Sequence, residues 1–196
     1  GLNERLGRTD DAIRELQDIA RDYPNSPVAD LQLGDVYRAK SRYKDAIAAY
    51  DRAVARVTHP LPTDWVVYYH RGIAYDRATQ WDQAEADFQR ALTLAPDQPL
   101  VLNYLGYSWA DRGHNLDRAL AMIEKALQRR PNDGAITDSL GWVMFRMGKI
   151  AEAVRLLERA DELEPDDPTT NGHLGDDYWA VGRRIDESSP MVDARL

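Results

Sequence analysis

The sequence has no cysteine and only four histidines in 196 residues. The absence of cysteine excludes structural disulfides, thiolate zinc sites and cysteine nucleophiles, although a cysteine-free chain fits either side of a membrane. No histidine pairs with another histidine or with a carboxylate at the spacing of an HExxH helix. The four stand at His59, His70, His114 and His173. No metal site is therefore expected.

Long apolar runs are also missing, because none approaches the ~20 residues that a membrane span requires. We therefore expect no direct membrane insertion. The net charge of -8 and the pI near 5.0 argue against non-specific binding of nucleic acid or anionic membranes, since both need clustered Lys and Arg. The chain begins with Gly1 rather than Met, so it reads as a fragment of a longer protein and the lack of a signal peptide leaves the compartment open.

Sequence motifs of common enzyme classes are absent as well. The chain contains no GxxxxGK[ST], GxGxxG or GxSxG motif, and no strand is predicted that could present one. The acidic run at residues 162–167 lacks the spacing of a calcium-binding loop. The sequence therefore predicts a protein that is not an enzyme and that holds no cofactor.

A short word centred on glycine recurs along the chain. Residues 138–148 read DSLGWVMFRMG around Gly141, and similar words surround Gly34, Gly72, Gly106 and Gly175. In chain order, these five glycines are 38, 34, 35 and 34 residues apart. An alanine, a large residue and a second alanine follow in fixed columns: Ala46, Tyr50 and Ala53; Ala84, Phe88 and Ala91; Ala119, Ile123 and Ala126; Ala153, Leu157 and Ala160. Prolines close most of the units.

A period near 34 with L-G-x-x-Y, A-x-x-x-F, A and P resembles the tetratricopeptide repeat (TPR). The resemblance implies an all-α, right-handed superhelical solenoid of stacked antiparallel helix pairs, with about eleven helices. The expected units are a partial unit at 1–26, full units at 27–64, 65–98, 99–133 and 134–167, the first helix of a last unit at 168–182, and a poorly ordered tail at 183–196.

The residue types in these columns fit helix packing. Glycine and alanine are expected where two helices cross, because a larger side chain would hold the backbones apart. Ala46, Tyr50 and Ala53 lie on one apolar stripe of a helix. Turns with a glycine C-cap are predicted at LGRT, DRGH and RMGK, between the first and the second helix of a unit.

The resemblance also implies which residues line the concave groove, since these come from the first helix of each unit. Transferred to this sequence, the groove residues are Arg38, Tyr69, His70, Ile73, Arg77, Asn103, Tyr104, Tyr107, Trp142, Phe145, Arg146 and Trp179. Exposed aromatic rings beside arginines are typical of binding hot spots. The sequence thus favours a protein-interaction scaffold that binds a peptide or helix of a partner.

Two alternatives stay open. The aromatic residues could instead pack against neighbouring helices or against the chain's own tail at Met191, Val192 and Leu196. The function could also be structural, with the incomplete end repeats stacking on a second copy to form a homo-oligomer. A weaker resemblance of LGYSWADRG and DSLGWVMFRMG to bacterial repeat proteins, some of them in the cell envelope, makes the periplasm one expected location and the cytoplasm the other.

Overall fold

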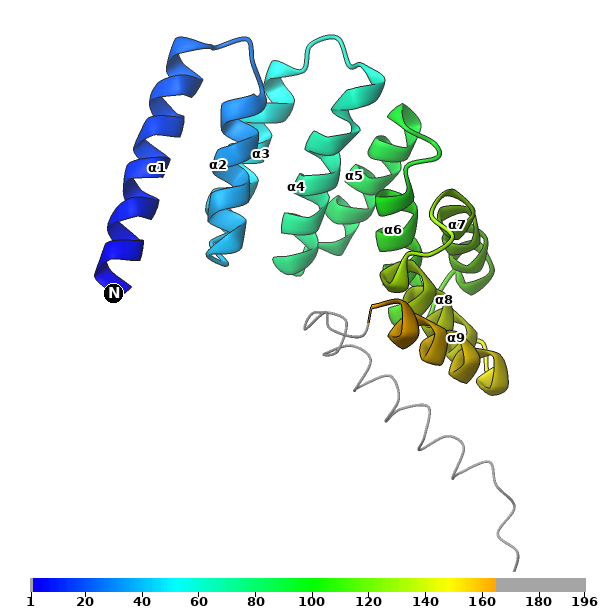
Figure 1. Ribbon diagram of the computed structural model, residues 1–196. Helices are drawn as coiled ribbons and strands as arrows, with labels where there is room; N and C mark the ends of the chain where they lie inside the picture. The colour runs from blue at the N-terminus through cyan, green and yellow to red at the C-terminus, as the bar shows by residue number, and fades with distance from the viewer. Residues whose placement is uncertain (1, 165–196) are drawn as a thin grey trace, which may run out of the picture. The chain divides into compact units, whose positions relative to one another are not determined.

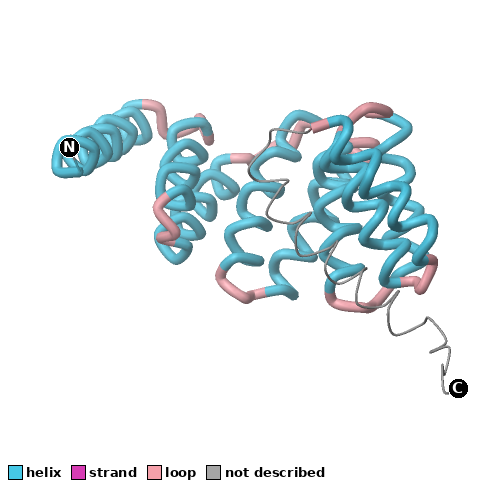
Figure 2. The backbone as a smooth tube through the Cα atoms, turned by 60° about the horizontal axis from the view of Figure 1, so that its bottom comes forward, coloured by secondary structure: helices cyan, strands magenta, loops and turns pink. Residues whose placement is uncertain are grey.

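The computed structural model describes the backbone of residues 2–164 and the side chains of residues 8–164. This part of the chain consists of nine α-helices and one short 3-10 helix, joined by turns, and contains no strand (Figures 1 and 2). The elements are α1 (Leu2–Asp22), α2 (Val28–Ala39), α3 (Tyr43–Arg56), η1 (Pro62–Asp64), α4 (Trp65–Arg77), α5 (Trp81–Leu94), α6 (Pro99–Asp111), α7 (Leu116–Arg129), α8 (Gly134–Arg146) and α9 (Ile150–Leu163). The predicted all-α class is confirmed.

The chain divides into two compact units, Gly1–Pro96 and Asp97–Leu196. In the first unit α2 packs on α3 and α4 packs on α5, while α1 lies against α2 and α3 against α4. In the second unit α6 packs on α7 and α8 on α9, and α8 also contacts α6 and α7. We call α2, α4, α6 and α8 the first helices, and α1, α3, α5, α7 and α9 the second helices. Each helix packs mainly on neighbours in the sequence, as a helical repeat requires.

The repeated glycines lie where each first helix crosses its second helix. A Cβ atom built on Gly72 would lie 2.7 Å from Cε1 of Phe88, closer than two carbon atoms can approach without a shift of one of them. The other glycines face the large residue of the same column, in the pairs Gly34 with Tyr50, Gly106 with Ile123 and Gly141 with Leu157. The predicted role of the glycine column is confirmed.

The turns inside the helix pairs share one backbone feature. The residue seven positions after the repeated glycine has a positive φ in every pair: 56° at Ser41, 61° at Thr79, 72° at Gly113 and 80° at Gly148. The glycine turns predicted at DRGH and RMGK are therefore present. In the two pairs of the first unit a serine and a threonine adopt the same left-handed conformation, which favours glycine.

Two expectations about the chain ends have different outcomes. The turn predicted at LGRT is wrong, because α1 runs without a break from Leu2 to Asp22. Glycine permits a helix to end but does not force it, since a helical glycine costs only about 1 kcal/mol relative to alanine, and no proline follows Gly7 closely. The helix expected at 168–182 and the tail at 183–196 lie outside the described residues, where the remainder of the expected eleven helices would fall.

Candidate functional site

The first helices of the first unit are joined by a polar network. The Tyr50 hydroxyl on α3 donates to Asp35 Oδ1 on α2 at 2.7 Å. The His70 Nδ1 atom on α4 lies 2.6 Å from the same carboxylate oxygen. Arg38 Nε donates to the Tyr50 hydroxyl at 3.3 Å. Asp35 therefore links three helices and sets the orientation of Arg38 and His70, two of the predicted groove residues.

The electrostatics of this network keep Asp35 ionised. Burial raises the pKa of Asp35, but hydrogen bonds from His70 and Tyr50 and the nearby positive charge of Arg38 lower it further, and the net pKa lies below its usual range. Burial and the hydrogen bond to Asp35 raise the pKa of Tyr50, so this phenol stays protonated and remains a donor. The network thus presents a fixed carboxylate and a fixed guanidinium on α2.

The other predicted residues of the first unit lie on α4. The Tyr69 ring packs on Trp65, with ring centroids 5.6 Å apart, and on Phe88 at 6.1 Å. Burial raises the pKa of the half-buried Tyr69. Ile73 is also half-buried, whereas Arg77 at the end of α4 is exposed. The first-helix face of this unit therefore offers mainly polar and cationic groups, with part of one aromatic ring.

In the second unit the predicted residues are mostly aromatic. Tyr104 and Tyr107 on α6 are half-buried, as is Trp142 on α8. The Trp142 ring stacks on Phe145, with centroids 5.2 Å apart and planes at 27°. The guanidinium carbon of Arg146 lies 5.6 Å from the centre of the Trp142 ring, within the range of a cation–π interaction.

Buried polar atoms on both α6 and α8 have no hydrogen bond within residues 8–164. Asn103 Oδ1 on α6 is an acceptor and Trp142 Nε1 on α8 is a donor, and neither has a partner among the described residues. Helices α6 and α8 contact each other directly. A buried polar group without a partner costs about 1–3 kcal/mol, so such a pair is a place where a ligand's polar groups would be stabilised.

The structure changes the expectation for one groove residue and leaves another outside its range. Phe145 was expected at the groove surface, but it is only 7% exposed, because its ring lies under Trp142 and within the packing of α8. Trp179 lies outside the described residues. Arg38, Tyr69, His70, Ile73, Asn103, Tyr104, Tyr107, Trp142 and Arg146 are half-buried and Arg77 is exposed. The other described aromatic residues of the predicted groove, Tyr69, Tyr104, Tyr107 and Trp142, are thus neither freely exposed nor fully buried.

The sequence pattern does not predict the network around Asp35. The repeat pattern places Tyr50 on the apolar stripe of its helix, because its column holds Phe88, Ile123 and Leu157 in the other units. The hydroxyl group that distinguishes Tyr50 from these residues was the available signal. A buried phenol needs a hydrogen-bond partner, and Asp35 follows the repeated glycine directly.

The described residues show no sign of two other kinds of site. Between residues 8 and 164, no three His, Asp or Glu side chains come together in a way that could hold a metal ion. No helix in the described range has the length and apolar character needed to cross a membrane. Among these residues, the first-helix faces hold the residues that the repeat pattern assigns to ligand binding.

Comparison with known proteins identifies the class. Residues 4–59, 65–98 and 112–169 each match a tetratricopeptide repeat family. Together these segments cover both units of the chain. The chain therefore belongs to the tetratricopeptide repeat proteins, a class whose members generally act as non-catalytic scaffolds.

Particular relatives agree with this assignment. The chain is 31% identical over 172 residues to the TPR repeat-containing protein PA4667 of Pseudomonas aeruginosa, covering 88% of this chain but only 28% of that protein. The crystal structure of MamA matches with a TM-score of 0.67 and 26% identity, over 83% of this chain and 86% of MamA. YrrB, described as a TPR protein with an unusual peptide-binding site, matches with a TM-score of 0.65 and 18% identity, over 94% of this chain and 87% of YrrB; at this identity the likeness shows the fold alone.

Proposed function

We propose that this chain is a protein-interaction scaffold that binds a peptide or helix of a partner protein on its first-helix faces. The observation that carries the proposal is the composition of the α6 and α8 face. Half-buried Tyr107 and Trp142 lie on it together with Asn103 Oδ1 and Trp142 Nε1, two buried atoms that have no hydrogen-bond partner within residues 8–164. Large aromatic side chains with a polar handle are the residues that most often dominate the binding energy of protein interfaces.

The chemistry of this face favours a polypeptide as the ligand. An acceptor and a donor on adjacent helices match the N–H and C=O groups that a peptide backbone presents. The aromatic rings provide apolar contacts for a partner's side chains, and Arg146 would orient an acidic group of the partner. Arg146 is itself held in place, since its Nη1 donates to the carbonyl oxygen of Asp111 at 2.6 Å.

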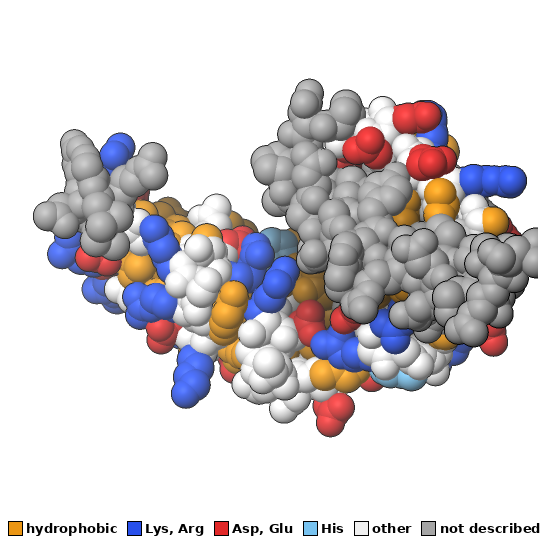
Figure 3. Space-filling view, turned by 90° about the horizontal axis from the view of Figure 1, so that it is seen from below, with side chains coloured by type: hydrophobic (Ala, Val, Ile, Leu, Met, Phe, Trp, Pro, Cys, Tyr) orange, Lys and Arg blue, Asp and Glu red, His pale blue; other side chains and the backbone are white. Residues whose placement is uncertain are grey.

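Basic side chains beside apolar ones support the same proposal for other parts of the surface. The face shown in Figure 3 carries several Lys and Arg side chains next to hydrophobic ones in the part drawn in colour. In the first unit, exposed Arg77 and half-buried Arg38 and His70 provide cationic and polar contacts near the Tyr69 ring. Such groups add specificity and association rate to an interface more than they add affinity.

Affinity capture from cells of the source organism tests the proposal. The chain is compared with a Tyr107→Ala, Trp142→Ala double variant and with an Arg155→Ala, Arg159→Ala control on exposed positions of the second helix α9. We expect the first variant to lose the captured proteins and the control to retain them. Recovery of the same proteins by all three chains would contradict binding on the α6 and α8 face.

A second candidate function rests on the apolar columns of α1. Ala12, Leu16 and Ile19 occupy the columns that are 0% exposed in α3, α5, α7 and α9, yet in α1 the first two are half-buried and Ile19 is 38% exposed. In the four pairs a first helix covers these columns. A second copy of the chain that covered this face of α1 would form a homo-oligomer. Light scattering over a range of concentrations should then show association that Ile19→Glu abolishes; a mass that stays monomeric at all concentrations would reject this function.

A further inference from the structure

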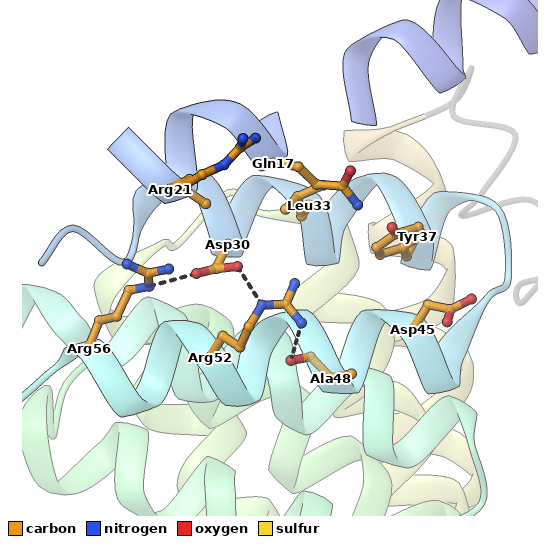
Figure 4. A pocket seen from close by; sticks show the side chains of 10 residues that line it. Gln17, Arg21, Asp30, Leu33, Tyr37, Asp45, Ala48, Arg52 and Arg56 are labelled. Atoms are coloured by element: carbon orange, nitrogen blue, oxygen red, sulfur yellow. Dashed lines mark hydrogen bonds and ion pairs between the residues drawn. The ribbon is translucent and has the colours of Figure 1, made fainter. Parts of the chain in front are cut away.

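The second helices of the first unit leave an open cavity between them. It has a volume of about 400 Å³ and lies over α2, between α1 and α3 (Figure 4). Gln17 and Arg21 approach it from α1, Leu33 forms its floor on α2, and Arg52 approaches from α3. This site differs from the first-helix faces, so it does not rest on the function proposed above.

The equivalent place one repeat further along the chain is filled by a side chain. There Arg71 on α4 donates to both carboxylate oxygens of Asp87 on α5, each at 2.7 Å, and to Asp51 on α3 at 2.9 Å. The Arg71 guanidinium also lies over the rings of Tyr68 and Tyr75. One side chain therefore bridges α3 and α5 and closes the groove between them.

The residues at the same repeat positions in the α1–α3 groove cannot form this bridge. Leu33 and Arg71 each stand directly before the repeated glycine of their unit. Aligned on the alanine columns, Gln17 on α1 corresponds to Asp51 on α3, and Ala49 on α3 corresponds to Asp87 on α5. Leucine has no group that could donate to either helix, and neither partner position carries a charge. The cavity is therefore the volume that the Arg71 bridge fills in the next repeat.

The cavity lining carries three arginines, Arg21, Arg52 and Arg56, and two carboxylates, Asp30 and Asp45. Asp45 already pairs with Arg42 at 2.7 Å, so the balance of charge favours an anionic ligand. Asp30 is only 1% exposed and accepts from Arg52 Nε at 2.8 Å and from Arg56 Nε at 2.7 Å, so one carboxylate orients two guanidinium groups. Arg52 remains half-exposed at the cavity wall. Arg21 pairs with Asp18 at a highly exposed position, where such a pair contributes little.

The floor of the same cavity is apolar. Leu33 and Ala20 are buried beneath it, and Ala48 lies on the α3 side. The volume falls within the roughly 300–1,000 Å³ of typical ligand sites, and charged and polar side chains form most of the walls around the apolar floor. An apolar side chain that entered over Leu33 and Ala20 would bring an adjacent acidic group toward Arg21 and Arg52, which line the same cavity.

We propose that the α1–α3 groove is a second docking site, which binds an extended segment of a partner protein that carries an acidic side chain beside an apolar one. The acidic side chain lies between Arg21 and Arg52, and the apolar side chain packs on Leu33 and Ala20. Arginine suits this role because its planar guanidinium binds a carboxylate through two parallel hydrogen bonds.

A titration followed by amide NMR tests this site on the complete chain. The probes are two tetrapeptides with blocked ends, Leu-Glu-Leu-Glu and Leu-Lys-Leu-Lys. We expect saturable shifts at Ala20, Leu33 and Ala48 with the acidic peptide and none with the basic one. Equal binding of both peptides, or no saturable shift with either, would overturn the proposal.

Matched variants locate the binding. Ala48→Trp fills the exposed α3 wall of the cavity, and Ala86→Trp places the same ring at the corresponding exposed position of α5, beside the groove that Arg71 already fills. We expect at least a tenfold loss of affinity for the acidic peptide in Ala48→Trp and no change in Ala86→Trp. Arg21→Glu should weaken binding and Arg14→Glu, an exposed change on the same helix, should not. Binding that survives Ala48→Trp, or that is lost in Tyr107→Ala, Trp142→Ala instead, would place the peptide elsewhere and reject the α1–α3 site.

Discussion

His70 Nδ1 and Asp35 Oδ1 lie 2.6 Å apart, although the two residues are separated by thirty-five positions in the sequence. This hydrogen bond joins the first helices of two successive repeats, α4 and α2. The Tyr50 hydroxyl donates to the same oxygen, so the carboxylate also binds the second helix of its own pair. One ionised group therefore fixes the relation between three helices and the direction of the groups that face a ligand.

The lowered pKa of Asp35 makes the free energy of unfolding decrease at acidic pH. Because the folded-state pKa lies below the ordinary value of 3.8, its contribution is fully present above that pH and is lost as the pH falls through the folded value. The free energy of unfolding, measured with urea between pH 5 and pH 3, should fall with acid less steeply in Asp35→Asn than in the wild type. Tyr50→Phe removes one donor and should move the loss to higher pH. An identical acid profile for the wild type and Asp35→Asn would contradict this role.

The contact between Gly72 and Phe88 predicts a pair of coupled substitutions. Gly72→Ala places a Cβ atom against the Phe88 ring and should lower the free energy of unfolding by about 1–3 kcal/mol, through overpacking. Phe88→Leu in the same chain makes room for the added methyl group, so the double variant should be more stable than the sum of the single changes predicts. Additive effects in a double-mutant cycle of urea unfolding would show that the glycine is not held by this contact.

The left-handed residue in each turn predicts a stabilising substitution. Thr79 has φ 61°, a conformation that costs a residue with a side chain about 1–2 kcal/mol. Thr79→Gly should therefore raise the melting temperature, and Ser41→Gly should do so to a smaller extent because serine is not β-branched. The reverse change Gly148→Thr should lower it. A lower melting temperature for Thr79→Gly would mean that the turn is stabilised by the threonine side chain.

The Arg71 bridge predicts a large loss that a second change restores. Arg71→Met leaves Asp87, which is 5% exposed, without its partner and should cost about 3 kcal/mol, since breaking a buried ion pair leaves an uncompensated charge. Arg71→Met together with Asp87→Leu removes both charges and should recover most of the loss. Urea unfolding of the three chains measures both effects. Equal stability of Arg71→Met and the wild type would show that the bridge contributes little.

The sequence predicted the repeat architecture because steric columns recur in it. A glycine opposite Phe88 or Leu157 serves the same contact in each pair, so the period was visible without any single strong motif. The helix break at Gly7 was wrong, because a local glycine signal carries no information about what packs on the helix. The columns of residues 2–22 resemble those of the other second helices, and the helix simply extends further toward its start.

The details of the candidate sites could be predicted only in part. Position in the repeat placed Tyr107 and Trp142 on first helices, but it could not show that Phe145 is buried beneath Trp142, because that depends on the rotamers of neighbouring rings. The cavity between α1 and α3 was not visible in the sequence either. It arises from Leu33 standing at the position of Arg71, a difference that acquires meaning only when the partners on both neighbouring helices are known.

Site-directed photo-crosslinking tests most directly the claim that the first-helix faces bind a partner protein. A benzoylphenylalanine residue is placed at Tyr69 or Tyr107 on first helices, or at Gln89 or Arg155, which are exposed on the second helices α5 and α9, and the chain is irradiated in extracts of the source organism. Adducts with the same partner are expected from Tyr69 or Tyr107 and not from Gln89 or Arg155. Adducts that form only from the second-helix positions would contradict the claim.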